Sequence, residues 1–148
     1  MDVFVYGTLT DPERVEGVLA EYAFGGEMVL RGLYRVDGTY PTLAPGGQVA
    51  GRLLETPEIE RLDRYEGVER GLYVRVAVPV ENKGDGARTE GPNEEGSNGS
   101  DERRTVAVYV GDPAALGLNS EIEWPGDGSF AERVERYARD RSVRVQHA

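Results

Sequence analysis

Alternating apolar and polar positions mark several short strands along the chain. The pattern is clearest over residues 72–80 and 105–110, and it recurs more weakly over 27–36 and 48–55; over residues 3–6, two valines alternate with Phe4 and Tyr6. A period of two residues is typical of β-strands that bury one face.

The strands at 72–80 and 105–110 bracket a long segment of different composition. Residues 82–104 are rich in glycine, asparagine, serine and acidic residues and contain no large apolar side chain. Such a segment cannot contribute to a core. We therefore expect a hairpin whose two strands are joined by a flexible acidic loop at about 82–104.

Two helix-start signals lie between the strands. Asp11 is followed by proline, an N-cap with proline at the first helical position, which predicts a helix running to about Tyr22. Thr56 is likewise followed by proline, and Gly67 is well placed to end this second helix.

A third helix is predicted near the end of the sequence. It starts at Ser129, and Glu132 three residues later completes a capping box. Because strands outnumber helices and no regular βαβ alternation occurs, the fold class is α+β with a curved or closed sheet. The length of 148 residues predicts a single domain over 1–148.

Composition removes several classes of chemistry. The chain has no cysteine, and its single histidine, His147, lies one residue from the end, so disulfides, thiolate metal sites and cysteine nucleophiles are excluded. The net charge is −10, and of 17 basic residues only Lys83 is a lysine. Because the basic residues are spread along the chain, we expect no nucleic-acid partner.

Hydropathy indicates where the protein resides. No run of eighteen apolar residues occurs, and the first fifteen residues show neither a basic leader nor an apolar signal core. We therefore expect a cytoplasmic protein with no membrane partner. The sequence leaves the oligomeric state open.

The usual motifs for cofactors and metals are missing. The chain has no phosphate-binding loop, no nucleophile elbow, no zinc-protease motif and no cluster of metal ligands. We therefore expect neither a metal nor a cofactor. Any catalysis must come from carboxylates, tyrosines, hydroxyls and backbone amides.

One carboxylate lies at an unusual position in the second helix. Ile59 and Leu62 mark the buried face, and the next position on that face is Glu66. It also falls in the last helical turn, whose partial negative charge disfavours a second one. Both effects raise a carboxyl pKa, which makes Glu66 a candidate general base. In the alternative interpretation, the side chain turns to solvent or pairs with a nearby arginine: Arg61, Arg64 or Arg70.

Three tyrosines share a strand position. Tyr6, Tyr73 and Tyr109 fall on the opposite side of their strands from the aliphatic stripe. Their hydroxyls either line a polar pocket between sheet and helix or belong to ordinary strand residues, since tyrosine has high β-propensity.

The first strand ends in a turn that leaves backbone groups available. The amides of Gly7, Thr8 and Leu9 have no partner within the strand, and glycine permits close backbone approach. Such a turn either cradles an anion, for example a carboxylate, or is an ordinary strand-to-helix connection.

Six segments stand out when taken in order: YGTL at 6–9, DGTYP at 37–41, VAGRLLE at 49–55, LDRYEG at 62–67, YVRVAVPV at 73–80 and VAVYV at 106–110. Together they resemble one known family, the γ-glutamylcyclotransferase-like (AIG2-like) family. The resemblance covers roughly residues 3–110 without the loop. It implies a small, mixed, mainly antiparallel β-barrel flanked by helices, with a pocket where the YGTL turn meets the LDRYEG helix.

The resemblance also implies a reaction without a cofactor. The α-amino group of a small-molecule γ-glutamyl substrate attacks its own γ-carbonyl, which closes 5-oxoproline and releases an amine or amino acid. Glu66 would be the general acid/base, the amides at 7–9 would hold a carboxylate or the oxyanion, and Tyr6, Tyr73 and Tyr109 would orient the substrate. The alternative is a binding module that keeps the barrel without turnover. The sequence does not distinguish possible leaving groups.

The scarcity of lysine in an acidic chain suggests one further hypothesis, adaptation to high salt. Molar ionic strength shortens the screening length to a few ångströms, which removes the repulsion among surface carboxylates. We therefore predict that the melting temperature rises steeply between low and molar salt. A flat salt titration would reject the hypothesis.

Overall fold

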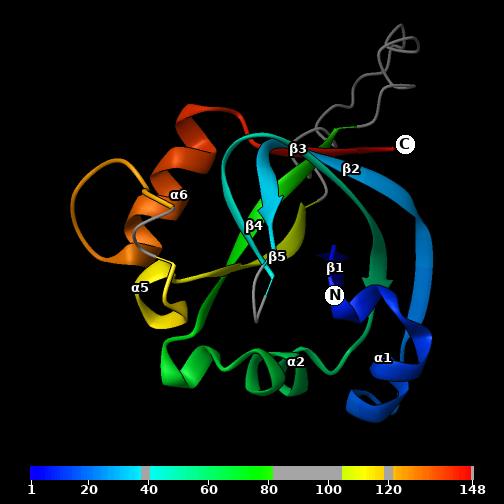
Figure 1. Ribbon diagram of the computed structural model, residues 1–148. Helices are drawn as coiled ribbons and strands as arrows, with labels where there is room; N and C mark the ends of the chain where they lie inside the picture. The colour runs from blue at the N-terminus through cyan, green and yellow to red at the C-terminus, as the bar shows by residue number, and fades with distance from the viewer. Residues whose placement is uncertain (38–40, 82–104, 119–121, 148) are drawn as a thin grey trace, which may run out of the picture.

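Six strands of the described residues close into a barrel (Figure 1). The computed structural model describes residues 1–37, 41–81, 105–118 and 122–147. The strands are β1 (Asp2–Val5), β2 (Ala23–Val36), β3 (Thr42–Glu55), β4 (Tyr73–Glu81), β5 (Thr105–Gly111) and β6 (Arg144–His147). The predicted acidic loop at 82–104 lies outside the described residues.

The barrel is mixed and mainly antiparallel. Its order is β1-β3-β2-β6-β4-β5, and the sheet closes where β5 meets β1. The pairs β1–β3, β2–β3, β2–β6 and β4–β5 are antiparallel, whereas β4–β6 and β1–β5 are parallel. The expected α+β barrel and the predicted pairing of β4 with β5 are both confirmed.

Helices cover the barrel on two sides. The α-helices are α1 (Pro12–Val18), α2 (Ile59–Glu66), α5 (Pro113–Leu116) and α6 (Phe130–Asp140), and η1 (Thr8–Thr10) and η2 (Val68–Arg70) are short 3₁₀ turns. In Figure 1, α1 and α2 lie below the barrel and α5 and α6 lie on its left. Among the described residues, no helix has the length and apolar character needed to cross a membrane.

Two apolar clusters hold these layers together. The first fills the barrel and includes Phe4, Leu30 and Val108. The second lies between the barrel and the helices, where Val3 of β1 packs with Leu62 of α2 and with residues of α1. Because β1 is buried on both faces, its apolar residues run continuously instead of alternating.

The first helix is shorter than predicted. It ends at Val18 and does not reach Tyr22. The backbone amides of Ala20 and Glu21 donate to Oε1 of Glu58, at 2.8 and 3.4 Å. A carboxylate from the start of the second helix thus accepts hydrogen bonds from the chain where it leaves α1.

The second helix also begins differently from the prediction. Thr56 is not its N-cap, because the helix starts at Ile59 and the N-cap position is Glu58. The Thr56 hydroxyl accepts from the Glu58 amide at 3.0 Å and donates to the Glu21 carbonyl at 2.7 Å, so it stabilises the preceding turn. The predicted end is confirmed, since Gly67 caps the helix in the left-handed conformation.

The remaining differences concern strand lengths and the end of the chain. Strand β3 begins at Thr42, before Pro45, because this part pairs with β2 alone and proline is tolerated where one side is unpaired. The capping box of α6 at Ser129 and Glu132 is confirmed. The short elements α5 and β6 were not predicted.

Close approach of β1 to β3 leads to a prediction about Gly51. A Cβ there would overlap the Val5 carbonyl oxygen and lie 2.7 Å from the Phe4 ring. Gly51→Ala should therefore lower the free energy of unfolding by about 1–3 kcal/mol in urea titrations. Gly17→Ala is the control, because nothing lies within 4 Å of its added Cβ in α1, and it should stabilise by about 0.5–1 kcal/mol. A Gly51→Ala protein as stable as the wild type would contradict this packing.

Candidate active site

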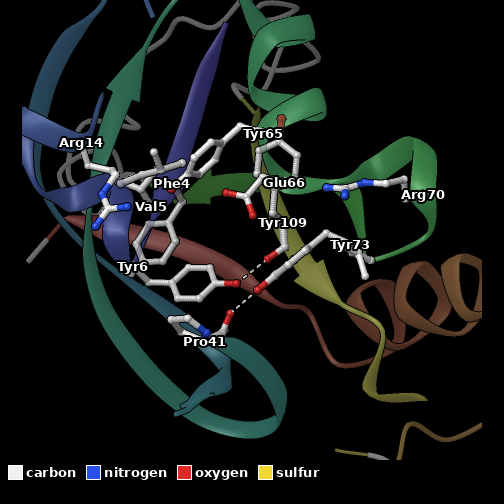
Figure 2. Close-up of a pocket in the computed structure, with 13 residues that line it drawn as sticks. Phe4, Val5, Tyr6, Arg14, Pro41, Tyr65, Glu66, Arg70, Tyr73 and Tyr109 are labelled. Carbon is white, nitrogen blue, oxygen red and sulfur yellow. Dashed lines mark hydrogen bonds between the residues drawn. The ribbon is translucent and has the colours of Figure 1, made fainter. Parts of the chain in front are cut away.

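A cavity of about 490 Å³ opens where the end of β1 meets the end of α2. Figure 2 shows its aromatic walls and the carboxylate that enters it. The described lining residues are Phe4, Val5, Tyr6, Gly7, Leu9, Arg14, Pro41, Tyr65, Glu66, Arg70, Leu72, Tyr73 and Tyr109. The YGTL and LDRYEG segments therefore meet at one pocket.

Glu66 is the last residue of α2, and its carboxylate points into the cavity (Figure 2). One turn earlier, Leu62 is fully buried, which fixes the face of the helix that turns inward. Burial raises the pKa of Glu66 to about 7.

The carboxylate has no protein partner among the described residues. None of them donates it a hydrogen bond, and none of the arginines considered from the sequence, Arg61, Arg64 and Arg70, forms an ion pair with it. An unpaired, partly buried carboxylate binds a proton more tightly than one in water. The alternative of a paired or fully solvated Glu66 does not describe this structure.

The three candidate tyrosines all line the cavity, and each hydroxyl already donates its proton. Tyr6 donates to the Tyr109 carbonyl at 2.6 Å, Tyr73 to the Pro41 carbonyl at 2.7 Å, and Tyr109 to Oδ1 of Asp63 at 2.7 Å. The remaining function of a hydroxyl whose proton is committed is to accept hydrogen bonds. Such oxygens suit a ligand that brings N–H groups.

Burial raises the pKa of the Tyr6 hydroxyl well above its usual value, and the nearby Glu66 carboxylate adds to the effect. Tyr6 therefore stays neutral at physiological pH. Each of the three tyrosines lies on the opposite side of its strand from the valines, as the sequence predicts. Tyr6 packs with the barrel interior, whereas the other two pack on the helix-covered face, because the valines of β1 point toward the helices.

Sequence reasoning missed a polar network beside the site. Nη1 of Arg75 lies 2.9 and 3.0 Å from the two carboxylate oxygens of Asp63, which also accepts from the Tyr109 hydroxyl. The network joins α2 to β4 and β5, three residues before Glu66. Asp63 belongs to the LDRYEG segment and Arg75 to YVRVAVPV, but neither segment by itself shows that the two side chains meet.

The turn after β1 forms another wall of the cavity. The Gly7 carbonyl accepts from both the amide and the hydroxyl of Thr10, at 3.0 and 2.7 Å. The amides of Gly7 and Leu9 have no acceptor among the described residues, as is usual for the first N–H groups of a helical turn. The structure does not describe the side chain of Thr8.

The pocket holds a carboxylate, hydroxyl acceptors and backbone donors, without a set of metal ligands. Within the described part of the chain, no three histidine, aspartate or glutamate side chains gather to hold an ion. The arrangement can accept a proton from a bound amine and hold an anionic group at the turn.

A match over most of the sequence assigns the chain to a family. Residues 3–122 match the family described as gamma-glutamyl cyclotransferase, AIG2-like. The chain belongs to this family. The matched range contains all thirteen described residues that line the pocket.

Individual relatives agree with this assignment. The chain is 38% identical over 87 residues to AIG2-like protein C of Arabidopsis thaliana, a match that covers 53% of this chain and 49% of the relative. The aligned part thus spans about half the length of that curated relative.

Solved structures share the fold at low identity. A structure titled gamma-glutamyl cyclotransferase has a TM-score of 0.53 at 17% identity, over 94% of this chain and 98% of the other. A human protein, titled uncharacterized protein loc79017, has a TM-score of 0.52 at 19% identity, over 92% and 96% of the two chains. At this identity both comparisons establish the barrel fold alone.

The raised pKa of Glu66 predicts a pH-dependent effect on stability. Because the folded-state pKa of about 7 exceeds the ordinary 4.5, the folded protein binds this proton more tightly than the unfolded chain. The charged group should therefore destabilise the fold by about 3 kcal/mol above pH 7, and this penalty should shrink as the pH falls toward 4.5.

Glu66→Gln should accordingly be more stable than the wild type at pH 8 in chemical denaturation, and the gain should disappear near pH 4.5. Glu69→Gln, at an exposed neighbouring position, is the matched control and should show no such pH-dependent gain. A Glu66→Gln protein with no advantage at pH 8 would contradict a desolvated carboxylate.

Proposed function

We propose that the protein catalyses a γ-glutamylcyclotransferase-type reaction with Glu66 as the general acid/base. The observation that carries the proposal is the Glu66 carboxylate, which points into the cavity without a partner and with a pKa of about 7. Family membership supports the reaction class.

The proposed reaction needs one group that accepts protons from the attacking nitrogen and donates protons to the departing nitrogen. In the proposed reaction, the substrate α-ammonium loses a proton to Glu66, and the freed amine attacks the γ-carbonyl carbon within the same molecule. A new C–N bond closes the five-membered lactam, and the original γ-amide C–N bond breaks. The attacking nitrogen loses two protons in all and the departing nitrogen gains two, so the net proton count is unchanged. A carboxyl group with a pKa near neutrality can both accept and donate them.

Positioning supplies much of the acceleration in this proposal. Nucleophile and electrophile belong to one substrate, so holding the glutamyl chain folded replaces a bimolecular encounter. Neither a metal nor a covalent intermediate is required. The aromatic walls of the cavity restrict the conformations of the bound chain.

The other pocket residues have roles that follow from their hydrogen bonds. The hydroxyls of Tyr6 and Tyr73 donate to carbonyls, so their lone pairs accept from the substrate ammonium. The amides at 7–9 bind the glutamyl α-carboxylate or the developing oxyanion. Tyr109 acts through its backbone carbonyl, which orients Tyr6.

The proposal predicts the pH dependence of turnover. With γ-glutamyl substrates scored by 5-oxoproline release, kcat/KM should rise with pH through a pKa of about 7, because only ionised Glu66 accepts the ammonium proton. Glu66→Gln should lower kcat by roughly 10²–10⁴-fold and remove this dependence. Glu69→Gln, at an exposed position outside the pocket, should retain the wild-type rate and profile.

Two results would count against this mechanism. A Glu66→Gln protein that forms 5-oxoproline as fast as the wild type would reject Glu66 as the base. If neither protein turns over but a γ-glutamyl ligand raises the melting temperature of both, the chain is a binding module on the same fold.

A further inference from the structure

Two arginines line the cavity, and neither guanidinium forms a hydrogen bond or ion pair among the described residues. Arg14 and Arg70 make no ion pair among the described residues, although the chain as a whole carries a net charge of −10. Figure 2 shows them on opposite sides of Glu66. A pocket with a cation at each side fits a ligand that carries two anionic groups.

The local fold brings Arg70 back toward the site. Gly67 ends α2 with a φ of 78°, and the η2 turn then reverses the chain. A Cβ built on Gly67 would lie 3.0 Å from Nη2 of Arg70, so the guanidinium is folded back over the backbone that follows Glu66. The apolar side chain of Leu72 lines the cavity beside it.

Arg14 belongs to the other side of the pocket. It lies in the first turn of α1, shortly after the η1 turn, whose Leu9 also lines the cavity. In Figure 2 its guanidinium lies on the side of Val5 and Tyr6, away from Arg70. Gly7 and Leu9, whose amides have no acceptor among the described residues, thus line the cavity together with Arg14.

We infer that Arg70 binds a carboxylate on the leaving group, and that the preferred substrates are γ-glutamyl amino acids instead of γ-glutamylamines. This inference rests on the proposed function. The glutamyl α-carboxylate, common to every substrate, occupies the side formed by the turn amides and Arg14. The scissile γ-amide then lies near Glu66, and the departing amino acid extends toward Arg70 and Leu72.

The two classes of leaving group, amino acids and simple amines, differ in charge. An amino acid brings a carboxylate that a guanidinium binds through charge-assisted hydrogen bonds, whereas a simple amine brings none. With a neutral leaving group, Arg70 would gain no partner in the complex. Arg70 is therefore a specificity-determining residue for the leaving group.

The test compares two substrates of nearly identical shape, γ-glutamyl-alanine and γ-glutamyl-alaninamide, which differ only in the charge of the leaving group. The wild type should favour the carboxylate form by about tenfold to a hundredfold in kcat/KM. Arg70→Gln should bring this ratio close to one. Arg14→Gln should lower kcat/KM for both substrates and keep the ratio, because both carry the α-carboxylate.

Arg64→Gln is the matched control. It removes the same charge from an exposed arginine of α2 that does not line the cavity, and it should keep the wild-type ratio. A wild-type ratio near one, or a ratio that survives Arg70→Gln, would overturn the inference. A ratio that collapses in Arg14→Gln instead would reverse the assignment of the two arginines and overturn it as well.

Calorimetry separates this inference from the proposed reaction. The affinities of the two compounds are measured on Glu66→Gln and on Glu66→Gln combined with Arg70→Gln, where turnover is not needed. If the wild type forms no 5-oxoproline but binding favours the carboxylate form only when Arg70 is present, the function fails and the specificity assignment stands. If binding is equal for both compounds, or absent, the specificity assignment fails.

Discussion

The site is organised around a partly buried carboxylate, Glu66, that forms no ion pair with any of the described residues. Glu66 has this environment because α2 ends against the pocket, with Leu62 buried one turn earlier and Gly67 turning the chain away. Ionised Glu66 is destabilised by burial, and no described side chain offsets that penalty. A buried charge without a partner lowers the stability of the folded state. A carboxylate kept at such a position therefore indicates a functional role and not a structural one.

The barrel supplies the rigidity that such a group requires. The inward face of α2 packs on β1, and the Arg75–Asp63–Tyr109 network ties the same helix to β4 and β5. The Tyr109 carbonyl in turn accepts a hydrogen bond from the Tyr6 hydroxyl. A series of hydrogen bonds thus connects α2 to Tyr6 in the pocket. The tyrosine hydroxyls and the Glu66 carboxylate are thus held by strands and a helix, which are more precise supports than loops.

Much of this arrangement could be predicted from the sequence, where local chemistry determined it. The period-two strands, the end of α2 at Gly67 and the capping box at Ser129 follow from backbone and side-chain preferences of a few neighbouring residues. The position of Glu66 on an apolar helix face indicated a candidate base for the same reason. The start of α2 was missed because the Thr56 hydroxyl bonds to Glu21, a contact distant in sequence. The Asp63–Arg75 pair and the placement of Arg14 and Arg70 likewise depend on tertiary packing that no local pattern encodes.

The central claim is that Glu66 is desolvated and unpaired, and a direct titration of its carboxyl group tests it best. The side-chain carboxyl carbons of glutamate are labelled with ¹³C, the Glu66 signal is assigned by its loss in Glu66→Gln, and its chemical shift is followed from pH 3 to 9. The account predicts a midpoint near pH 7. A midpoint near the ordinary value of 4.5 would contradict it.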